Sequence, residues 1–280
     1  MPELPEVETV RRLIRPSVVG RRIEGVRVGW ERTLGGQTPR SFGSAVRGAH
    51  FTDVGRRAKY LVLSLEREGA SAGALVIHLR MTGRLQVVPR EQKPSDWLRV
   101  SMDLEGDTRL EFIDVRKFGR VLFTRDPGEI LGGLGPEPLS DDFSEEWLLG
   151  ELRVRRRMLK PLLLDQSFLA GLGNIYVDEA LHQAKLHPEG SADRVCPLKA
   201  RALYAAIRTT LEEAIKREGS SFDTFYRTPE GQPGSYQHQF QVYGRDGKPC
   251  RRCGHTLVKI VVGQRGTHLC RRCQPKPRKL

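Results

Sequence analysis

The sequence has little that a membrane or secreted protein would need. No apolar run approaches the roughly 20 residues that a membrane helix requires. Glu3, Glu6 and Glu8 stand where a signal peptide would carry basic and then apolar residues. Hydrophobic residues make up 38% of the 280 positions and aromatic residues 7%. We therefore expect a cytoplasmic globular protein that is long enough for two domains with separate cores.

Acidic residues are scarce, above all near the C-terminus. The chain has 34 Asp and Glu against 47 Lys and Arg, and its net charge is +13. Residues 241–280 contain eleven Lys or Arg and one acid, Asp246. Because a basic chain attracts polyanions and no amphipathic membrane helix accompanies the charge, we expect nucleic acid as the partner, and no membrane. A basic surface that only aids solubility is the simpler alternative.

Cysteine is also rare, yet four of the five residues form two CxxC pairs. Cys250 and Cys253 precede Cys270 and Cys273 by a spacer of sixteen residues, and Cys196 stands alone. This spacing predicts a tetrahedral site for one structural Zn²⁺, because each CxxC turn can place two thiolates on one metal. Two disulfides are the alternative, which a reducing compartment disfavours. We expect Cys196 to be an inert buried thiol.

Short runs of alternating or β-branched residues fill the first 130 positions. They lie at 59–65, 74–79, 98–104, 110–113 and 119–124, with turns rich in Gly, Pro and charged residues between them. This pattern predicts a mainly antiparallel β domain, a sandwich or a barrel. A helix beginning near Pro5 precedes the runs, since a proline in the first turn followed by acids is a helix start.

The pattern changes near Gly132. Helical segments are expected at 145–152, 157–164, 174–184 and 197–218, so the fold class is α+β. Residues 219–240 lack periodicity and are typical of a functional loop. Beyond them, 256–262 and 267–270 flank the sequence GQRG, which predicts a hairpin with Arg265 at its tip.

Several motifs occur together and in order. They are PELPE at 2–6, LRMTGRL at 79–85, DVRKFG at 114–119, GLGNIY at 171–176 and GQRGT inside the four-cysteine segment. With them the chain resembles the bacterial formamidopyrimidine-DNA glycosylases, a family shared with endonuclease VIII, over essentially its whole length. The resemblance implies three parts: a catalytic β-sandwich at 1–131, a helix-two-turns-helix DNA-binding domain at 132–240, and a zinc finger at 241–280. It also implies that residues 219–240 close over an everted base.

The resemblance implies base-excision repair of oxidised purines, such as 8-oxoguanine and formamidopyrimidines, in duplex DNA. It implies a glycosylase that is also an AP lyase and cleaves the strand by β,δ-elimination. The partners are then double-stranded DNA with oxidised bases or abasic sites, and we expect a monomer without an obligate protein partner. The expected location is the cytoplasm, at the nucleoid.

The catalytic residues carried over are Pro2, Glu3, Lys59 and Arg265. The resemblance implies that Met1 is removed and that the freed secondary amine of Pro2 forms a Schiff base with the sugar. That role suits the chemistry, because an attacking secondary amine gives an iminium cation that can act as an electron sink. The resemblance makes Glu3 the general acid and base, Lys59 a phosphate and proton-transfer group, and Arg265 a phosphate clamp.

The expected DNA-binding residues are Met81, Arg116, Phe118, Arg155, Lys160 and Asn174. The resemblance implies that the first three fill the gap that an everted nucleotide leaves. Asn174 lies in a glycine-rich turn before a helix, where backbone N–H groups can hold a phosphate, and Arg155 and Lys160 could add contacts. The alternative to this DNA-binding role is that Met81 and Phe118 are ordinary core residues. For His78 two interpretations stay open, a DNA contact and a satisfied buried histidine. Trp97 and Leu98 depart from the family pattern, in which a histidine is common.

Two other functions remain open from the sequence. An endonuclease VIII-like enzyme would share the fold and act on oxidised pyrimidines. A non-enzymatic zinc-ribbon protein would bind DNA through the same basic tail. It would not depend on a free Pro2 amine.

Overall fold

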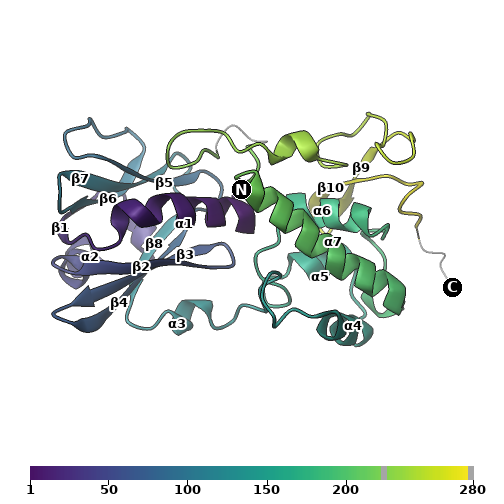
Figure 1. Ribbon diagram of the computed structural model, residues 1–280, viewed down its shortest axis with the longest axis horizontal. Coiled ribbons are helices and arrows are strands. Elements are labelled where there is room, and N and C mark those ends of the chain that lie inside the picture. The colour runs from purple at the N-terminus through teal and green to yellow at the C-terminus, as the bar shows by residue number, and fades with distance from the viewer. Residues whose placement is uncertain (222–225, 277–280) are drawn as a thin grey trace. The chain divides into compact units, whose positions relative to one another are not determined.

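The computed structural model describes residues 1–221 and 226–276. The chain divides into two compact units (Figure 1). Unit 1 contains Met1–Gly133 and Arg217–Ser235, and unit 2 contains Leu134–Lys216 and Tyr236–Leu280. The expected capping loop at 219–240 is therefore shared between the units, and its residues 222–225 lie outside the described residues.

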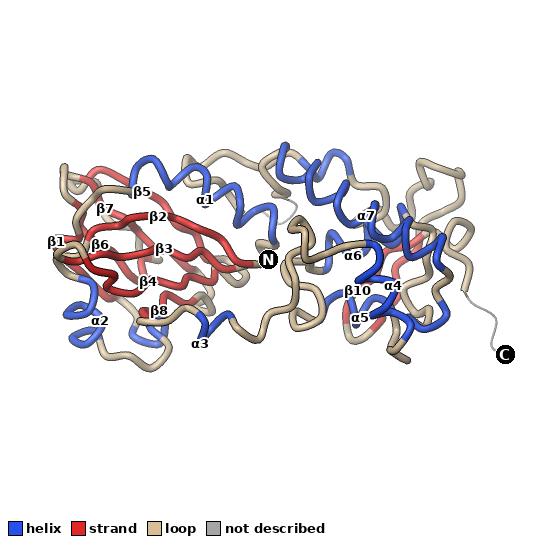
Figure 2. Tube along the Cα trace, turned by 60° about the horizontal axis from the view of Figure 1, so that its bottom comes forward, coloured by secondary structure: helices blue, strands red, loops and turns tan. Residues whose placement is uncertain are grey.

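Unit 1 contains two antiparallel four-stranded sheets, drawn in red in Figure 2. The first has the order β1-β6-β7-β5, with β1 at Ile23–Val28, β6 at Leu98–Leu104, β7 at Thr108–Asp114 and β5 at Gly83–Pro89. The second has the order β2-β3-β4-β8, with β2 at His50–Arg57, β3 at Tyr60–Arg67, β4 at Ala70–His78 and β8 at Arg120–Thr124. Both sheets contribute to one apolar core, which confirms the predicted sandwich.

Strand burial follows the period of two that the sequence shows. On β3, Leu61, Leu63 and Leu65 are buried and alternate with partly exposed residues. Three strands were not predicted, β1, β2 and β5. Their sequences IEGVRV, HFTDVGRR and GRLQVVP carry too many polar or glycine residues for a local pattern. Pairing with better-defined neighbours fixes them as strands.

Helix α1 (Leu4–Val18) begins one residue before the predicted start at Pro5. Its apolar face, with Val7, Val10, Ile14 and Val18, is part of the core of unit 1. The other helices of this unit are short: η1 (Glu31–Leu34), α2 (Pro39–Val46) and α3 (Gly128–Leu131). Helix α2 was not predicted.

Unit 2 is helical and ends in a hairpin. Its helices are α4 (Glu145–Arg153), α5 (Leu159–Leu164), α6 (Asn174–Gln183), η2 (Ala192–Arg194), α7 (Pro197–Lys216) and η3 (Tyr236–Gln239), and its strands are β9 (Val258–Val262) and β10 (Arg265–Leu269). Helix α5 starts two residues later than predicted, because Met158 is extended and pairs with Ser191. Across residues 1–221 and 226–276, no helix combines the length and apolarity needed to cross a membrane.

Candidate functional site

The N-terminal residues of unit 1 are buried where α1 begins. Pro2 is buried, and Glu3 is only 2% exposed. Glu3 is the N-cap of α1, and its backbone N–H donates to Glu6 Oε2 at 2.8 Å. A proline and a carboxyl group thus lie at the positive end of a helix, where backbone N–H groups favour negative charge.

Glu6 joins the start of α1 to the segment 217–235 of the same unit. Its second oxygen, Oε1, accepts a hydrogen bond from Ser220 N at 2.7 Å. Gly219 has φ +77°, and a Cβ added there would lie 2.7 Å from Glu6 Oε1, so this position requires glycine. Tyr226 adds a hydrogen bond from its hydroxyl to Glu218 O at 3.1 Å. The sequence indicated a supporting role for Glu6, but it could not identify these contacts.

Lys59 lies in the two-residue turn between β2 and β3, at a strand end as predicted. Its neighbour Ala58 has φ +53°, and Lys59 itself is 6% exposed. Arg56 holds this turn against α1, because its Nε donates to Glu8 Oε2 at 3.1 Å and its Nη1 donates to Ala58 O at 3.0 Å. Figures 1 and 2 show the turn at the same end of unit 1 as the start of α1.

Glu8 is the centre of an ion-pair cluster behind this end of the helix. Its carboxylate accepts hydrogen bonds from Arg11 at 2.8 and 3.0 Å and from Arg12 at 2.7 Å, besides Arg56. Burial alone would raise the pKa of Glu8, but these hydrogen bonds and the charges of Arg11 and Arg56 lower it to about 2. Glu8 is therefore ionised at neutral pH and ties α1 to β2.

His78 is a satisfied buried histidine, one of the two readings that the sequence left open. It is 6% exposed, its ring packs edge-on against Tyr60 with centroids 4.6 Å apart, and its Nδ1 accepts from Arg80 N at 2.9 Å. Burial, then the charges of Arg80 and Lys59, lower the pKa of His78 to about 3. Its ring is neutral at physiological pH.

The structure brings the loops that carry Met81, Arg116 and Phe118 together. Asp114, at the end of β7, is 1% exposed and accepts hydrogen bonds from Thr82 Oγ1 and from Arg116 N through Oδ1. Thr82 Oγ1 also accepts from Arg116 N at 3.1 Å. Asp114 and Thr82 thus join the two loops, a role that sequence reasoning missed. The sequence offered one signal for this role, because Asp114 is an acid that directly follows the strand sequence LEFI.

Phe118 is not a core residue. Its side chain is 49% exposed, and Arg116 lies over its ring with Cζ 4.9 Å from the centroid. Met81 is half-buried. Gly119, which follows Phe118, donates its N–H to Asp114 Oδ2 at 2.7 Å and thereby fixes the base of the loop.

Arg265 is exposed in the hairpin of unit 2, but it does not lie in the turn. The turn is formed by Gly263 and Gln264, whose φ values are +55° and +62°. Arg265 is the first residue of β10 and pairs with Val262, which corrects its predicted position at the tip. The next residue, Gly266, accepts hydrogen bonds through its carbonyl from Lys160 Nζ at 3.1 Å and from Asn174 Nδ2 at 3.0 Å.

Lys160, a predicted DNA contact, is completely buried. Its side chain is 0% exposed and forms an ion pair with the equally buried Asp178, with Nζ 2.6 Å from Oδ1. Asp178 Oδ2 in turn accepts from His268 N on β10 at 2.8 Å. The ammonium thus connects α5 to α6 through Asp178 and to the hairpin through Gly266.

The two remaining residues of the predicted DNA contacts in unit 2 are less exposed than expected. Arg155 is half-buried, pairs with Glu151 at 2.5 Å and lies over the ring of Phe168 at 5.2 Å. Asn174, the first residue of α6, is also half-buried. Its Oδ1 has no hydrogen-bond partner among the described residues.

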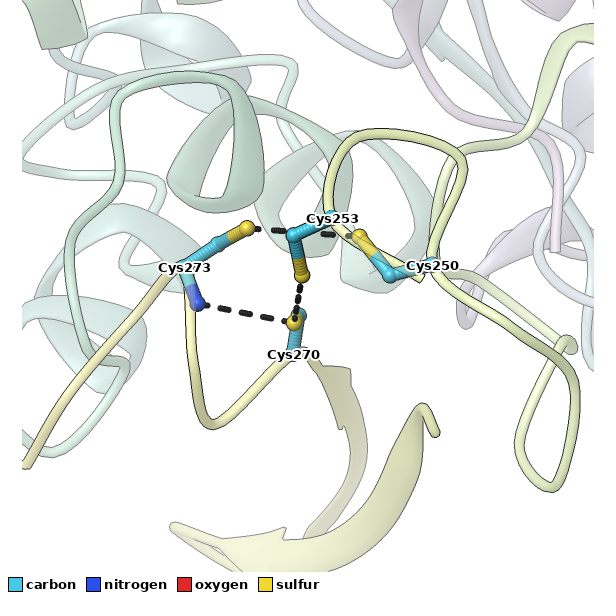
Figure 3. Close-up of side chains that lie close together, drawn as sticks. All are labelled: Cys250, Cys253, Cys270 and Cys273. Carbon is cyan, nitrogen blue, oxygen red and sulfur yellow. Dashed lines mark hydrogen bonds between the residues drawn. The ribbon is translucent and has the colours of Figure 1, made fainter. Parts of the chain in front are cut away.

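The four paired cysteines form a metal site (Figure 3). Their sulfur atoms all lie within 4.8 Å of one another, with Cys253 and Cys270 at 3.4 Å and Cys250 and Cys273 at 4.0 Å. A tetrahedron with Zn–S bonds of about 2.3 Å has edges of about 3.8 Å, so the four thiolates fit one Zn²⁺. The same distances are too long for disulfide bonds of about 2.05 Å. The predicted structural zinc site is confirmed.

Cys196 does not belong to this cluster. It is exposed rather than buried, directly before α7, so the expectation of a buried thiol was wrong.

Three family models match successive parts of the chain. They are described as the formamidopyrimidine-DNA glycosylase N-terminal domain (residues 1–121), the formamidopyrimidine-DNA glycosylase H2TH domain (134–226) and a zinc finger found in FPG and IleRS (247–276). The third covers the four cysteines, and the first covers both PELPE and the loops around Asp114.

Relatives and solved structures are similar over almost the whole length. The formamidopyrimidine-DNA glycosylase of Heliobacterium modesticaldum is 45% identical over 98% of this chain and 100% of its own, and that of Protochlamydia amoebophila is 41% identical over 99% and 100%. Wild-type Lactococcus lactis Fpg, solved with DNA containing N7-benzyl-Fapy-dG, has a TM-score of 0.90 at 35% identity and covers 98% of this chain and 100% of its own. The MutM (Fpg) protein of Thermus thermophilus has a TM-score of 0.87 at 40% identity, with coverage of 99% and 100%. The chain belongs to the formamidopyrimidine-DNA glycosylase family.

Proposed function

We propose that this protein is a bifunctional DNA glycosylase and AP lyase that removes oxidised purines, such as 8-oxoguanine and formamidopyrimidines, from duplex DNA. Family membership supports a DNA glycosylase of base-excision repair with a DNA-binding zinc finger. One observation carries the finer proposal. Pro2 and Glu3 are buried at the start of α1, in a position suited to chemistry and unlike the usual loose terminus.

The proposed reaction begins once Met1 has been removed. The Pro2 nitrogen bonds to C1′ of the damaged nucleotide, the bond from C1′ to the base breaks, and the base leaves with a proton. Protonation of the ring oxygen lets the C1′–O4′ bond break, which opens the sugar and gives an iminium cation. The iminium cation acidifies C2′, whose proton loss expels the 3′ phosphate, and a second elimination expels the 5′ phosphate. Glu3 would protonate the sugar ring oxygen, a general-acid step that contributes about 10²- to 10⁴-fold in rate.

Cationic groups would bind the phosphates around the reacting sugar. Lys59 lies on the turn that Arg56 holds against α1, and Arg265 is exposed on β10. We propose that Lys160 and Asn174 act through Gly266, whose carbonyl they both hold, and thereby orient Arg265. Asn174 and Arg155 remain proposed backbone contacts.

The loops at Asp114 would fill the space that the everted nucleotide leaves. Phe118, which is 49% exposed, would wedge between bases, Met81 lies on the neighbouring loop, and the Arg116 guanidinium would bind base acceptors of the opposite strand. Extrusion of a base costs a few kcal/mol, which an apolar wedge partly offsets. We further propose that the protein acts as a monomer on chromosomal DNA.

The test is borohydride trapping on duplex DNA with one 8-oxoguanine opposite cytosine. We expect the Met1-free protein to give a covalent adduct at residue 2, and the Pro2→Gly variant and a chain that retains Met1 to give much less. Pro5→Gly is the matched control, because the Pro5 nitrogen lies inside the chain and cannot react. An equal adduct yield from the chain that retains Met1 would refute the Schiff base at Pro2.

The same assay separates the alternative functions. An endonuclease VIII-like enzyme would trap efficiently on an oxidised pyrimidine such as thymine glycol and poorly on 8-oxoguanine. A non-enzymatic zinc-ribbon protein would bind both duplexes and trap on neither. Preferential trapping on 8-oxoguanine is the result expected from the proposal.

A further inference from the structure

Helix α6 brings a histidine to the zinc site from outside the cysteine segment. His182 lies in the last turn of α6 and is 1% exposed. Its Nε2 is 3.6 Å from Sγ of Cys250, which is itself 3% exposed. Since sulfur is larger than oxygen, this distance fits a hydrogen bond between the ring and the sulfur.

The direction of this hydrogen bond follows from where the protons are. A zinc-bound thiolate carries no proton, so the imidazole must donate from Nε2. The other ring nitrogen, Nδ1, is buried and has no hydrogen-bond partner among the described residues. A proton on Nδ1 would be a buried donor without an acceptor, which is rarer in proteins than an unsatisfied acceptor. The tautomer with its proton on Nε2 therefore suits both nitrogens.

The contact is part of a larger attachment of the cysteine segment to α6. Arg252, between the first two cysteines, donates from Nη1 to the carbonyl of His182 at 2.9 Å. One turn earlier, Glu179 accepts the backbone N–H groups of Gln241, Val242 and Tyr243 at 2.8 to 2.9 Å. These contacts fix the His182 ring and the Cys250 loop relative to each other, so the hydrogen bond is pre-organised.

We propose that His182 donates a hydrogen bond to the zinc-bound thiolate of Cys250 and thereby slows loss of the metal. Four thiolates around Zn²⁺ carry a net charge of −2, and an N–H donor stabilises the charge on a buried sulfur. The hydrogen bond holds the sulfur in place in addition to its bond to the metal, so the thiolate leaves zinc more slowly. His182 is a positioning residue for the metal site and takes no part in the reaction on DNA.

The test compares zinc release from the full chain with zinc bound. His182→Phe removes the donor and keeps a ring of similar size, and His182→Gln keeps an N–H donor. His187→Phe is the matched control, because His187 is a buried histidine of the same unit whose Nδ1 accepts from Glu189 N instead of contacting a cysteine. With a chromogenic chelator in excess, we expect zinc release about 10-fold faster from His182→Phe, the size of effect common for partners of metal ligands. His187→Phe should release zinc at the wild-type rate, and His182→Gln at an intermediate rate.

A spectroscopic measurement separates the hydrogen bond from a packing effect. In the Co²⁺-loaded protein, loss of the donor raises the energy of the sulfur lone pairs, so the thiolate-to-cobalt charge-transfer band of His182→Phe should move to lower energy. The band of His182→Gln should stay near that of the wild type. Identical bands and identical release rates in His182→Phe and the wild type would overturn the proposal. If His182→Phe does not fold, a wild-type band in His182→Gln together with zinc release less than 10-fold faster than the wild type supports the proposal, and a shifted band overturns it. Neither measurement involves DNA, so the outcome is independent of the proposed lyase reaction.

Discussion

Replacement of Lys160 by methionine tests whether this residue supports the fold or contacts DNA. In the structure, Lys160 and Asp178 are both 0% exposed and 2.6 Å apart. Lys160→Met keeps an unbranched side chain that is one atom shorter, but it leaves the Asp178 carboxylate buried without its cation. Breaking a buried ion pair in this way costs about 3–5 kcal/mol. Because Asp178 keeps the N–H of His268 at 2.8 Å, we expect a loss near the lower end, about 3 kcal/mol.

The loss should appear in urea denaturation. With a slope of about 2 kcal/mol per M, 3 kcal/mol lowers the midpoint of the transition of unit 2 by about 1.5 M. Lys216→Met is the matched control, since Lys216 pairs with Glu213 at 2.9 Å while 69% exposed. A surface pair of this kind contributes about 0–1 kcal/mol. The double variant Lys160→Met/Asp178→Asn removes the stranded charge and should recover part of the loss.

DNA binding gives the result that would refute this reasoning. A lysine that neutralises a phosphate contributes about 0.9 to the slope of log affinity against log salt concentration. We expect the slope to be the same for Lys160→Met and the wild type, because Asn174 still holds the Gly266 carbonyl beside Arg265. A slope lowered by about 0.9, with an unchanged urea midpoint, would mean that Lys160 contacts DNA after all.

Four further outcomes can be checked. Glu8→Gln should lower the free energy of unfolding of unit 1 by about 2 kcal/mol at pH 7, after a discount for solvent screening. The pKa of Glu8 is about 2 in the folded protein against an ordinary 4.5. In urea denaturation, the stability difference between variant and wild type should therefore be complete above pH 4.5 and vanish as the pH falls toward 2. Phe118→Ala should lower single-turnover excision of 8-oxoguanine more than cleavage of a preformed abasic site, and equal losses would contradict the wedge. Arg265→Ala should reduce the salt slope of DNA binding by about 0.9, and an unchanged slope would exclude a phosphate contact. Zinc chelation should abolish duplex binding in a mobility-shift assay. Normal binding by the metal-free chain would show that the zinc finger is not needed for DNA binding.

Local sequence patterns were enough for the elements with a strong period. The β6 prediction at 98–104 agrees with the observed strand at both ends, and α4, α6 and α7 agree within two residues. The CxxC pairs predicted the metal site, because each pair fixes two ligands within a single turn. These features depend on neighbours only a few residues away in the chain.

The family motifs marked side chains without giving their environments. Phe118 and Lys160 both fall in expected positions of the sequence, yet one is half exposed and the other has no exposed surface at all. A motif fixes the order of residue types, whereas burial depends on which distant elements pack over each side chain.

The sequence by itself determined the α+β class, the helix that begins at PELPE and the four zinc ligands. All three follow from periodicities and residue spacings within short segments of the chain. Only the tertiary structure decided that Glu6 bonds to Ser220, 214 positions away, that Asp114 joins two loops, and that Lys160 is buried against Asp178. Each of these depends on a single polar partner from a remote element. A polar group needs such a hydrogen-bond partner only after folding has removed water from it, and the local sequence does not show which remote residue will be that partner.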